Sequence, residues 1–577
     1  MTFKGLEDLP MSNAKPWIAS YPPEVPASIA YPRVPLTHFL EQSAVKYPAN
    51  YALFFMGKRI TYSELLHYCY QFAHALIKRG VKKGDRVAIM LPNCPQTVIA
   101  YYAVLFAGAV VVQTNPLYTE RELGYHLSDS GATVIVALDT LYHRIRQVQP
   151  QTQLKHVILT SIGDFLPMFK KMLYPLVQRS KGERQRISFT HEVERFTHLL
   201  AESSASPVHV EIDPDEDLAL LQYTGGTTGV PKGVMLTHKN LIVNAVQSEK
   251  VMYKMHPGQE KIVGALPLFH VYGMTAVMNL GVKLAAEILL VPRFEAKQIL
   301  ELIHREKPSL FPGAPTMYIA LINHPELHKY DLSSIEACVS GSAALPRDVQ
   351  QQFELLTGGR LVEGYGMTET SPVTHSNHIW GRRKSGSIGV PWPDTDCRIV
   401  DPVTGEELPY GEIGELAVRG PQVMRGYWKR PDDTAAVLRS GWLLTGDMGY
   451  MDQEGFFYVV DRKKDLIIAG GFNIYPREVE EVLFEHPAVM EAAVIGVPDP
   501  YRGETVKAYI VLKQGEQVTA DELDGFCRKR LAAFKVPHVY EFRRELPKTF
   551  VGKVLRRQLQ EEAQMRQSDQ PHTQSNL

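Results

Sequence analysis

The chain has 577 residues and a formal net charge of -1, with 45% hydrophobic and 22% charged residues. A chain of this length exceeds what one hydrophobic core usually supports, so we expect two or more domains of ordinary globular composition. The balanced charge gives no overall electrostatic field that would attract nucleic acid, so we expect no nucleic-acid partner.

The sequence carries no recognisable targeting signal. The N-terminus lacks a charged start followed by an apolar core, so no signal peptide is predicted. No stretch reaches about 18 uninterrupted apolar residues, so no membrane span is predicted either. The five cysteines are scattered without a CxxC pair, which favours reduced thiols and a cytoplasmic protein: Cys69, Cys94, Cys338, Cys397 and Cys527.

The first third of the chain alternates helix and strand patterns. Thr61-x-x-Glu64 and Thr119-x-x-Glu122 are capping-box signatures, each of which predicts the start of a helix. Between and after them, the pattern predicts a strand, an apolar helix and two further strands at Arg86–Leu91, Pro95–Phe106, Ala109–Gln113 and Thr133–Ala137. Such alternation predicts a mostly parallel sheet covered by helices on both faces.

The segment DFLPMFKKMLYPLVQRS at Asp164–Ser180 mixes Phe, Met and Leu with Lys and Arg. Its two prolines are expected to interrupt any long helix. Two interpretations of it stay open at this point. The segment either lies at a membrane interface, which would give peripheral contact with the inner face of the plasma membrane, or caps the hydrophobic core.

The chain changes character over residues 394–457, where short strands separated by Gly and Pro turns predict a small β-rich subdomain. Beyond it, a helix at Pro476–Glu485 and a strand at Ala508–Lys513 predict a compact mixed segment. The polar tail from about Met565 is expected to be disordered.

The densest chemical signal is YTGGTTGVPKG at residues 223–233. Its glycines let the backbone approach an anion closely, and its N–H groups can line a phosphate cradle. Thr224, Thr227 and Thr228 add hydroxyl groups, and Lys232 adds a mobile positive charge. A Walker A loop requires Gly-Lys-Ser/Thr, whereas this lysine follows a proline. The segment therefore predicts a phosphate loop of another kind.

This segment resembles the phosphate loop of the acyl-adenylate-forming (AMP-binding) superfamily, which includes acyl-CoA synthetases, firefly-type luciferases and the adenylation domains of peptide synthetases. Further motifs of that family follow in order: LPLFH (266–270), YGMTE (365–369), GWLLTGD (441–447), DRKKD (461–465), GGFNIYP (470–476) and PKTFVGK (547–553). The resemblance covers roughly residues 35–560, and seven ordered motifs make it specific.

The resemblance implies both a fold and an activity. The expected fold class is α/β, with a large N-terminal domain (1–461) of mostly parallel sheets and a β-rich subdomain, and a small mobile α+β C-terminal domain (462–577). The implied enzyme is an ATP-dependent, AMP-forming ligase that needs Mg²⁺. It converts a carboxylic acid to acyl-AMP and pyrophosphate, and the thiol of CoA then gives acyl-CoA and AMP.

The family motifs imply a nucleotide site. They place Tyr365 against adenine, Thr368 on the α-phosphate and Glu369 on Mg²⁺, for which a carboxylate is the expected hard ligand beside phosphates. Asp447 and Arg462 match the two ribose contacts of the family. The remaining cofactor-binding residues implied are glycines of the two loops: Gly225, Gly226, Gly229, Gly364 and Gly366.

Other motif positions imply roles in the two half-reactions. Lys553 matches the lysine that contacts the α-phosphate and the substrate carboxylate, where a preorganised donor is typically worth about 2.7–4 kcal/mol of barrier. Lys464 matches the hinge about which the C-terminal domain rotates. Gly470 and Gly471 match the loop that lines the channel for the CoA pantetheine arm, where a side chain would obstruct the thiol.

The acid site is implied by a shorter set of residues. Phe269 and His270 match the aromatic-His pair that orients the acid, and His270 is not assigned as a base because a carboxylate is already ionised near neutral pH. Met274, Gly313 and Gly341 match the acyl pocket, although ordinary packing is an equal interpretation of these three. The GGTTG loop and the 164–180 segment resemble bacterial long-chain fatty-acid CoA ligases, which implies a fatty acid substrate.

Three alternative interpretations remain. The first is a medium-chain or aryl acid CoA ligase, and the second is a ligase that loads fatty acyl-AMP onto a carrier protein, against which the absence of a carrier domain argues. The third is a non-catalytic binding homologue, disfavoured by five retained residues: Lys232, Glu369, Asp447, Arg462 and Lys553. A homodimer is compatible with the sequence, which does not fix the oligomeric state.

Overall fold

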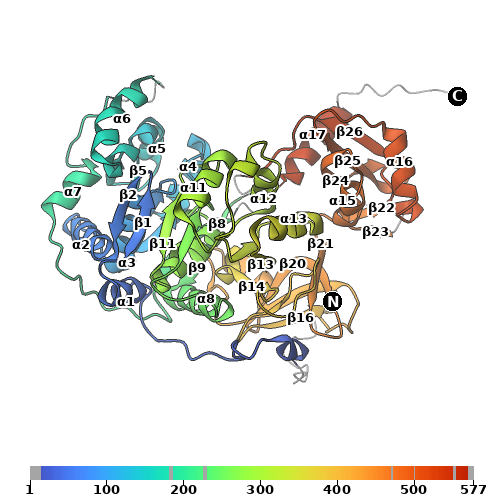
Figure 1. Cartoon of the computed structure of the whole chain (residues 1–577), viewed down its shortest axis with the longest axis horizontal. Helices are drawn as coiled ribbons and strands as arrows, with labels where there is room; N and C mark the ends of the chain where they lie inside the picture. Colours follow the sequence, from blue (N-terminus) through green and yellow to red (C-terminus); the bar gives the residue numbers. More distant parts are fainter. Residues whose placement is uncertain are drawn as a thin grey trace. The chain divides into compact units, whose positions relative to one another are not determined.

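A computed structural model describes residues 15–180, 186–224, 230–469, 472–499, 501–549 and 554–568 (Figure 1). These residues form two compact units. The larger unit comprises Lys15–Asp396 and Arg419–Leu443, and the smaller unit comprises Cys397–Val418 and the chain from Leu444 onward. The chain thus leaves the larger unit, returns to it for one short segment and leaves it again.

The larger unit is built on an extended sheet. Its strands are β3 (Arg86–Met90), β4 (Val110–Gln113), β5 (Val134–Leu138), β6 (His156–Thr160), β7 (Val193–Arg195), β8 (Leu218–Thr224), β9 (Lys232–Thr237) and β18 (Gly426–Tyr427). Their order is β18-β9-β8-β4-β3-β5-β6-β7. Neighbours from β8 to β7 are parallel, whereas β9 pairs antiparallel with both β8 and β18. The predicted mostly parallel sheet is confirmed.

Alternate residues of β3 face two different hydrophobic cores. Val87 and Ile89 belong to one cluster of buried side chains, whereas Ala88 and Met90 belong to another. All four are fully buried. The sheet is therefore covered on both faces, which explains why the strand reads as a continuous apolar run.

Two helices of the larger unit begin at the caps that the sequence predicts. Thr61 and Glu64 exchange side-chain and backbone hydrogen bonds in a capping box, and so do Thr119 and Glu122. The helices are α1 (His38–Lys46), α2 (Tyr62–Lys78), α3 (Pro95–Phe106), α4 (Glu120–Ser130), α5 (Tyr142–Val148), α6 (Met168–Ser180), α7 (Phe196–Glu202), α8 (His238–Val251), α9 (Val271–Gly273), α10 (Leu280–Lys283), α11 (Ala296–Glu306), α12 (Pro315–Ile322), α13 (Arg347–Thr357) and α14 (Pro431–Val437).

Two further sheets complete the larger unit. One has the order β10-β11-β1-β2, from strands β1 (Tyr51–Phe55), β2 (Lys58–Thr61), β10 (Lys261–Gly264) and β11 (Glu287–Leu290). The other has the order β12-β13-β14-β15, from β12 (Ala337–Ser340), β13 (Arg360–Gly366), β14 (Val373–Ser376) and β15 (Val390–Pro391). Leu310 bridges both, because it pairs with Ile262 of β10 and Ala337 of β12.

The smaller unit contains a β-rich part and an α+β part. The β-rich part has the order β16-β17-β20-β19 with β21 beside β20, from β16 (Asp396–Val400), β17 (Gly414–Arg419), β19 (Leu438–Arg439), β20 (Trp442–Met451) and β21 (Phe457–Arg462). The other sheet has the order β23-β22-β25-β24 with β26 beside β25, from β22 (Ile467–Ala469), β23 (Phe472–Ile474), β24 (Val489–Asp499), β25 (Gly503–Leu512) and β26 (Val539–Arg543). Its helices are α15 (Pro476–Phe484), α16 (Ala520–Arg528) and α17 (Arg556–Ser568). The predicted fold class is confirmed.

Helix α6 corrects one expectation. Its 13 residues include Pro175, so this proline does not interrupt it, whereas Pro167 lies directly before its first residue. A proline inside a helix removes one backbone hydrogen bond and strains the turn before it. Side-chain contacts offset this cost: Tyr174 packs against Gly163, and the Gln178 amide donates to Asp139 at 3.3 Å. None of the helices that the structure describes is long and apolar enough to cross a bilayer.

The C-terminal helix corrects a second expectation. Helix α17 runs to Ser568 and so includes the first residues of the tail that was expected to be disordered. Its Leu559 and Ala563 are buried against β24 and β25, and Arg557 pairs with Glu561 one turn later at 2.8 Å. Amphipathic burial together with i,i+4 pairs explains a helix in a polar sequence. The rest of the tail lies outside the described residues.

Candidate active site

The two ends of the predicted phosphate loop are fixed by an antiparallel pair. Thr224 ends β8 and lies opposite Lys232, the first residue of β9, and Tyr223 lies opposite Gly233. The loop residues between these strands, Gly225, Gly226, Thr227, Thr228 and Gly229, lie outside the described residues. The hairpin therefore sets where the loop leaves and re-enters the sheet.

Lys232 is held by two partners from a distant part of the sequence. Its Nζ lies 2.6 Å from Oδ1 of Asp433 on α14 and 5.3 Å from the ring centroid of Tyr427 on β18. Side-chain exposure is 23% for the lysine and 38% for the aspartate, so the pair remains accessible to a solute. A polyanion can compete with Asp433 for this ammonium group.

Asp129 of α4 anchors the same hairpin from behind. Its carboxylate accepts from the Tyr223 hydroxyl at 2.6 Å and pairs with Arg430 at 3.2 Å, while its carbonyl accepts from the Trp428 indole at 3.1 Å. Burial and the Asp129 carboxylate raise the pKa of Tyr223, which therefore stays a donor. Sequence reasoning missed both Asp129 and the 427–433 segment. Its dense aromatic and charged residues (YWKRPDD) were the available signal.

Glu369 lies in a short 3₁₀ turn, Thr368–Thr370, and is 7% exposed. Its Oε1 accepts from the Tyr427 hydroxyl at 2.8 Å, and its backbone carbonyl accepts from the Met424 amide at 2.8 Å. Burial and this carboxylate raise the pKa of Tyr427. Tyr427 thus brings Glu369 and Lys232, two of the predicted site residues, to one place.

A magnesium ion fits this carboxylate in its chemistry. Mg²⁺ in nucleotide sites is commonly bound through one or two carboxylates together with phosphate oxygens and water. Among the described residues no group of three or more His, Cys, Asp or Glu could form a complete protein cage for a metal. A single buried carboxylate suits a metal that arrives with its nucleotide.

The adenine and α-phosphate candidates lie beside Glu369 in the chain. Tyr365 is half-buried on β13, with its ring centroid 5.8 Å from that of His375. Burial lowers the pKa of His375 to about 3, so its ring is neutral near pH 7. Sterics alone require glycine at position 366, because a Cβ there would lie 2.0 Å from the Pro372 carbonyl oxygen. Gly364 and Thr368 are half-exposed neighbours of this strand end.

The acid-site candidates lie at a helix start. His270 caps α9, where its Nδ1 accepts from the Tyr272 amide at 3.3 Å. The Phe269 carbonyl accepts from Gln222 of β8 at 3.1 Å, which ties this turn to the strand that leads into the phosphate loop. Met274 opens a π-helical stretch, Met274–Asn279, and is fully buried. Such stretches are frequent at functional sites.

The structure gives Gly313 and Gly341 a packing role. A Cβ at Gly313 would lie 2.9 Å from the Tyr318 ring, and a Cβ at Gly341 would lie 2.9 Å from the Tyr272 ring. Both glycines therefore let an aromatic ring lie directly on the backbone. This supports the packing interpretation and leaves their assignment to an acyl pocket as a prediction.

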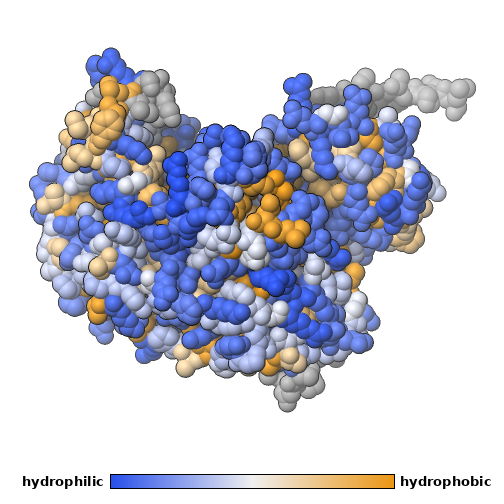
Figure 2. All heavy atoms as spheres, viewed as in Figure 1, coloured by the Kyte–Doolittle hydropathy of each residue, from blue (hydrophilic) through white to orange (hydrophobic). Residues whose placement is uncertain are grey.

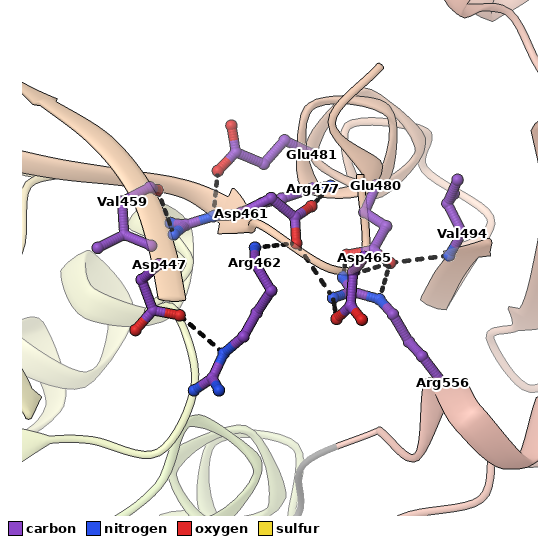
Figure 3. Close-up of polar contacts among 10 residues, drawn as sticks. All are labelled: Asp447, Val459, Asp461, Arg462, Asp465, Arg477, Glu480, Glu481, Val494 and Arg556. Carbon is purple, nitrogen blue, oxygen red and sulfur yellow. Dashed lines mark hydrogen bonds and ion pairs between the residues drawn. The ribbon is translucent and has the colours of Figure 1, made fainter. Parts of the chain in front are cut away.

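The two ribose candidates face each other on neighbouring strands of the smaller unit (Figure 3). Arg462 Nε pairs with Asp447 Oδ1 at 2.7 Å, and side-chain exposure is 5% for Asp447 and 32% for Arg462. The aspartate is also fixed through its backbone, since its amide donates to the Thr445 hydroxyl at 3.1 Å. The pairing of β20 with β21 thus brings the motifs of Asp447 and Arg462 together as cross-strand neighbours.

Beyond Arg462, the chain reaches the predicted hinge residue Lys464, which is exposed. Arg556 at the start of α17 lies beside this segment and joins three carboxylates (Figure 3). It donates to both oxygens of Glu480 at 2.8 and 2.6 Å, and to Asp461 and Asp465 at 3.4 Å each. Burial opposes its charge, but Glu480 and Asp461 raise the pKa of Arg556.

Three further predicted residues belong to the smaller unit. Lys553, Gly470 and Gly471 lie outside the described residues. The described residues that flank Gly470 and Gly471 belong to one sheet, because Ala469 of β22 pairs with both Phe472 and Gly503. The roles of all three remain predictions.

Comparison with known proteins gives matches over almost the whole chain. The profile of the AMP-binding enzyme family matches residues 40–428, and that of the AMP-binding enzyme C-terminal domain matches residues 478–553. A long-chain-fatty-acid–CoA ligase of Bacillus subtilis (strain 168) is 55% identical over 555 residues, which is 96% of this chain and 99% of that protein.

Solved structures agree in fold. ATP-bound MatB from Rhodopseudomonas palustris is 30% identical with a TM-score of 0.81, over 92% of this chain and 99% of that one. The anthranilate CoA ligase AuaEII in complex with anthranoyl-AMP is 27% identical with a TM-score of 0.84, over 94% of this chain and 100% of that one. The similarity therefore spans both units.

Proposed function

Because the chain belongs to the AMP-binding enzyme family, we propose that it is a long-chain fatty acid–CoA ligase that uses ATP and Mg²⁺. The observation that carries the substrate is the 55% identity to a Bacillus subtilis ligase of that name, along 96% of this chain and 99% of that protein. Adenylate chemistry is supported by the similarity to a CoA ligase solved with an acyl-AMP.

In the first half-reaction, a carboxylate oxygen of the fatty acid attacks the α-phosphorus of ATP, and the bond to the β-phosphate oxygen breaks to release pyrophosphate. Thr224 and Lys232 would hold the phosphates, and Lys232 would exchange Asp433 for a phosphate oxygen. Tyr365 would face adenine, Thr368 the α-phosphate, and Asp447 with Arg462 the ribose. Mg²⁺ held by Glu369 would neutralise charge that develops on the phosphates.

In the second half-reaction, the CoA sulfur attacks the acyl carbon, the thiol proton leaves, and the bond to the AMP oxygen breaks. We propose that Lys553 serves the first step and that Gly470 and Gly471 line the thiol channel in the second. The proposed domains are 1–461 and 462–577, with Lys464 as the hinge. This assignment is supported by the second family profile, which covers 478–553.

A substrate panel tests the proposed function. Purified protein with ATP, Mg²⁺ and CoA should form AMP, pyrophosphate and thioester with palmitate or oleate, at higher kcat/KM than with acetate, benzoate or anthranilate. Each buried methylene is worth about 0.8 kcal/mol, so a chain that fills an apolar pocket should gain orders of magnitude over acetate. Preference for an aryl or two-carbon acid would overturn the long-chain assignment but not the assignment as a CoA ligase.

We propose in addition that α6 contacts a lipid surface. Five of its apolar side chains are 43–75% exposed and share one side of the helix: Met168, Phe169, Met172, Leu173 and Leu176. Figure 2 shows this patch as orange spheres over α6. The opposite side is held by Tyr174 and Gln178 against the unit. The helix thus exposes its apolar face, the reverse of an ordinary surface helix.

Charge favours an anionic lipid surface as the partner of α6. Lys170 and Lys171 are exposed on either side of the apolar face, and burial together with the charge of nearby Lys171 lowers the pKa of Lys58. Interfacial helices combine such an apolar face with basic flanks. All five cysteines are buried, which fits a reducing compartment and supports a place at the inner face of the plasma membrane.

Vesicle flotation tests this contact. Phe165 is buried, so it is left intact, and the variant carries Met168→Ser, Phe169→Ser and Met172→Ser. A control carries serine at three equally exposed apolar positions elsewhere, Val45, Leu355 and Val403. The α6 variant should bind phosphatidylcholine–phosphatidylglycerol vesicles at least tenfold more weakly than wild type or control, since full burial of one such side chain alone contributes about 1.5–3 kcal/mol. Equal binding by all three proteins would restrict α6 to a structural role.

A further inference from the structure

Tyr427 contacts two groups of the candidate site from one position. Its hydroxyl donates to Oε1 of Glu369 at 2.8 Å, and its ring centroid lies 5.3 Å from Nζ of Lys232. The residue is 9% exposed, so bulk water weakens neither contact greatly. A hydrogen bond to a carboxylate and a cation over an aromatic ring both gain strength in such surroundings.

The backbone around Tyr427 is fixed on two sides. Strand β18 pairs it with Val234 of β9, directly after the phosphate-loop hairpin, and the Trp428 amide donates to the Gly233 carbonyl at 2.7 Å. On the other side, the Tyr427 amide donates to the Thr434 hydroxyl of α14 at 2.9 Å. The ring therefore starts from a backbone that is tied to the hairpin carrying Lys232.

We infer that Tyr427 is a positioning residue for the adenylation step: it holds the Glu369 carboxylate and the Lys232 ammonium in a fixed relation before the nucleotide binds. The inference rests on the proposed function, which assigns Glu369 to Mg²⁺ and Lys232 to the phosphates. Preorganised groups avoid the free-energy cost of ordering when a ligand arrives. One side chain thus prepares both the metal ligand and the phosphate ligand.

Two substitutions separate the two contacts. Tyr427→Phe removes the hydroxyl and keeps the ring over Lys232, so only the orientation of Glu369 is affected. Tyr427→Leu removes both contacts. Tyr62→Phe is the matched control, because Tyr62 is fully buried and its hydroxyl also makes a hydrogen bond, to the Ala286 carbonyl at 2.8 Å, outside the candidate site.

Calorimetric titration with α,β-methylene-ATP, in Mg²⁺ and in EDTA, measures the contribution of the metal to binding. Wild type and Tyr62→Phe should bind more tightly in Mg²⁺ than in EDTA. Tyr427→Phe should bind about tenfold more weakly in Mg²⁺ and within about twofold of wild type in EDTA, since only the metal ligand is disturbed. Tyr427→Leu should weaken binding in both buffers. A merely structural role would lower both affinities of Tyr427→Phe equally.

Wild type and Glu369→Gln distinguish failure of this inference from failure of the proposed function. If wild type binds the nucleotide with the same affinity in Mg²⁺ and in EDTA, the assignment of Glu369 to the metal is wrong. The second case is that Mg²⁺ raises the affinity of wild type and that Glu369→Gln abolishes this increase. If Tyr427→Phe then keeps the whole increase, Tyr427 does not position the carboxylate. Loss of the gain in both variants, with unchanged melting temperature for Tyr427→Phe, supports the inference.

Discussion

At the scale of single residues, the side chains that bear charge in the candidate site have protein partners that a ligand must replace. Lys232 is the clearest case, with Asp433 at 2.6 Å. Asp433 thus occupies the ammonium group that the phosphates of ATP would need. The pair keeps a partly buried cation compensated, and a triphosphate must displace the carboxylate to bind there.

The first prediction concerns this exchange. Asp433→Asn should tighten ATP binding severalfold, because the competing carboxylate and its repulsion of the phosphates are both removed. Asp432→Asn is the control, since it removes the same charge one residue earlier, whereas Lys232 pairs with Asp433. Equilibrium dialysis with labelled ATP measures both. Weaker binding by Asp433→Asn than by the control would mean that Asp433 orients the lysine instead.

Residue-level candidates could be named from the sequence where a motif is local. Lys232 and Glu369 were singled out within short motifs, and the structure links them through Tyr427. Tyr427, Asp433 and Asp129 were missed because each acts across the fold. The pairing of β18 with β9 joins residues almost 200 positions apart, and no local periodicity reveals such a register.

At the scale of elements, Arg556 joins the start of α17 to α15 and to the end of β21. Its guanidinium bonds both oxygens of Glu480, and Glu480 also accepts from the Val494 amide of β24 at 2.8 Å. Asp461 accepts from the Arg477 amide at 2.7 Å, so this carboxylate at the end of β21 is held by α15 as well. Three elements share one charged cluster (Figure 3).

The second prediction follows from that cluster. Arg556→Met should lower the opening free energy of the β24 and β25 amides by about 3 kcal/mol, because it leaves largely buried carboxylates without their cation. Arg557→Met should change it by less than about 0.5 kcal/mol, since its pair with Glu561 is more than half exposed. Hydrogen exchange by mass spectrometry measures both. Equal protection in the two variants would contradict a stabilising role for the cluster.

Element boundaries were predictable where the cause is short-range. The capping boxes at Thr61 and Thr119 and the bounds of α3 follow from neighbouring side chains. The helix through Pro175 was not predictable, because the contacts of Gln178 with Asp139 that hold it depend on tertiary structure. The last turn of α17 likewise has a tertiary contact, the ion pair of Arg566 with Glu541 of β26 at 2.9 Å.

At the scale of the whole molecule, the larger unit carries several buried neutral imidazoles. Burial lowers the pKa of His126 and His375 to about 3 and that of His238 and His378 to about 4. The unfolded chain binds protons at these sites below about pH 6.5, whereas the folded unit does not. Unfolding therefore takes up protons, and stability falls as the pH falls through this window.

The third prediction isolates one of these sites. Each such histidine contributes a slope of about 1.4 kcal/mol per pH unit between its two pKa values. His378→Leu should remove one such contribution from the loss of unfolding free energy on acidification. It should not lower stability near neutral pH, because the ring nitrogens of His378 have no hydrogen-bond partner among the residues that the structure describes. Calorimetry at about pH 7.5 and about pH 5.5 measures this, with the exposed His198→Gln as control. An unchanged slope for His378→Leu would refute it.

The fourth prediction concerns the two half-reactions. If the C-terminal domain presents different residues in each, Lys553→Ala should abolish pyrophosphate exchange yet still convert supplied acyl-AMP and CoA to thioester. Gly471→Leu should do the opposite and accumulate acyl-AMP, since a side chain blocks the channel. Single-turnover thioester formation reports the second step. Equal loss of both activities in both variants would place the two residues in one closed site.

The contacts of four glycines have a consequence for directed evolution of substrate range. Gly313 and Gly341 support the rings of Tyr318 and Tyr272, which a larger residue could displace, whereas Gly273 and Gly366 lie against backbone carbonyls: an added Cβ would come within 2.2 Å of the Pro267 oxygen and 2.0 Å of the Pro372 oxygen. A library for a new acid should therefore randomise position 341 jointly with 272 and position 313 jointly with 318. Positions 273 and 366 should stay constant, because no neighbouring side chain can yield there.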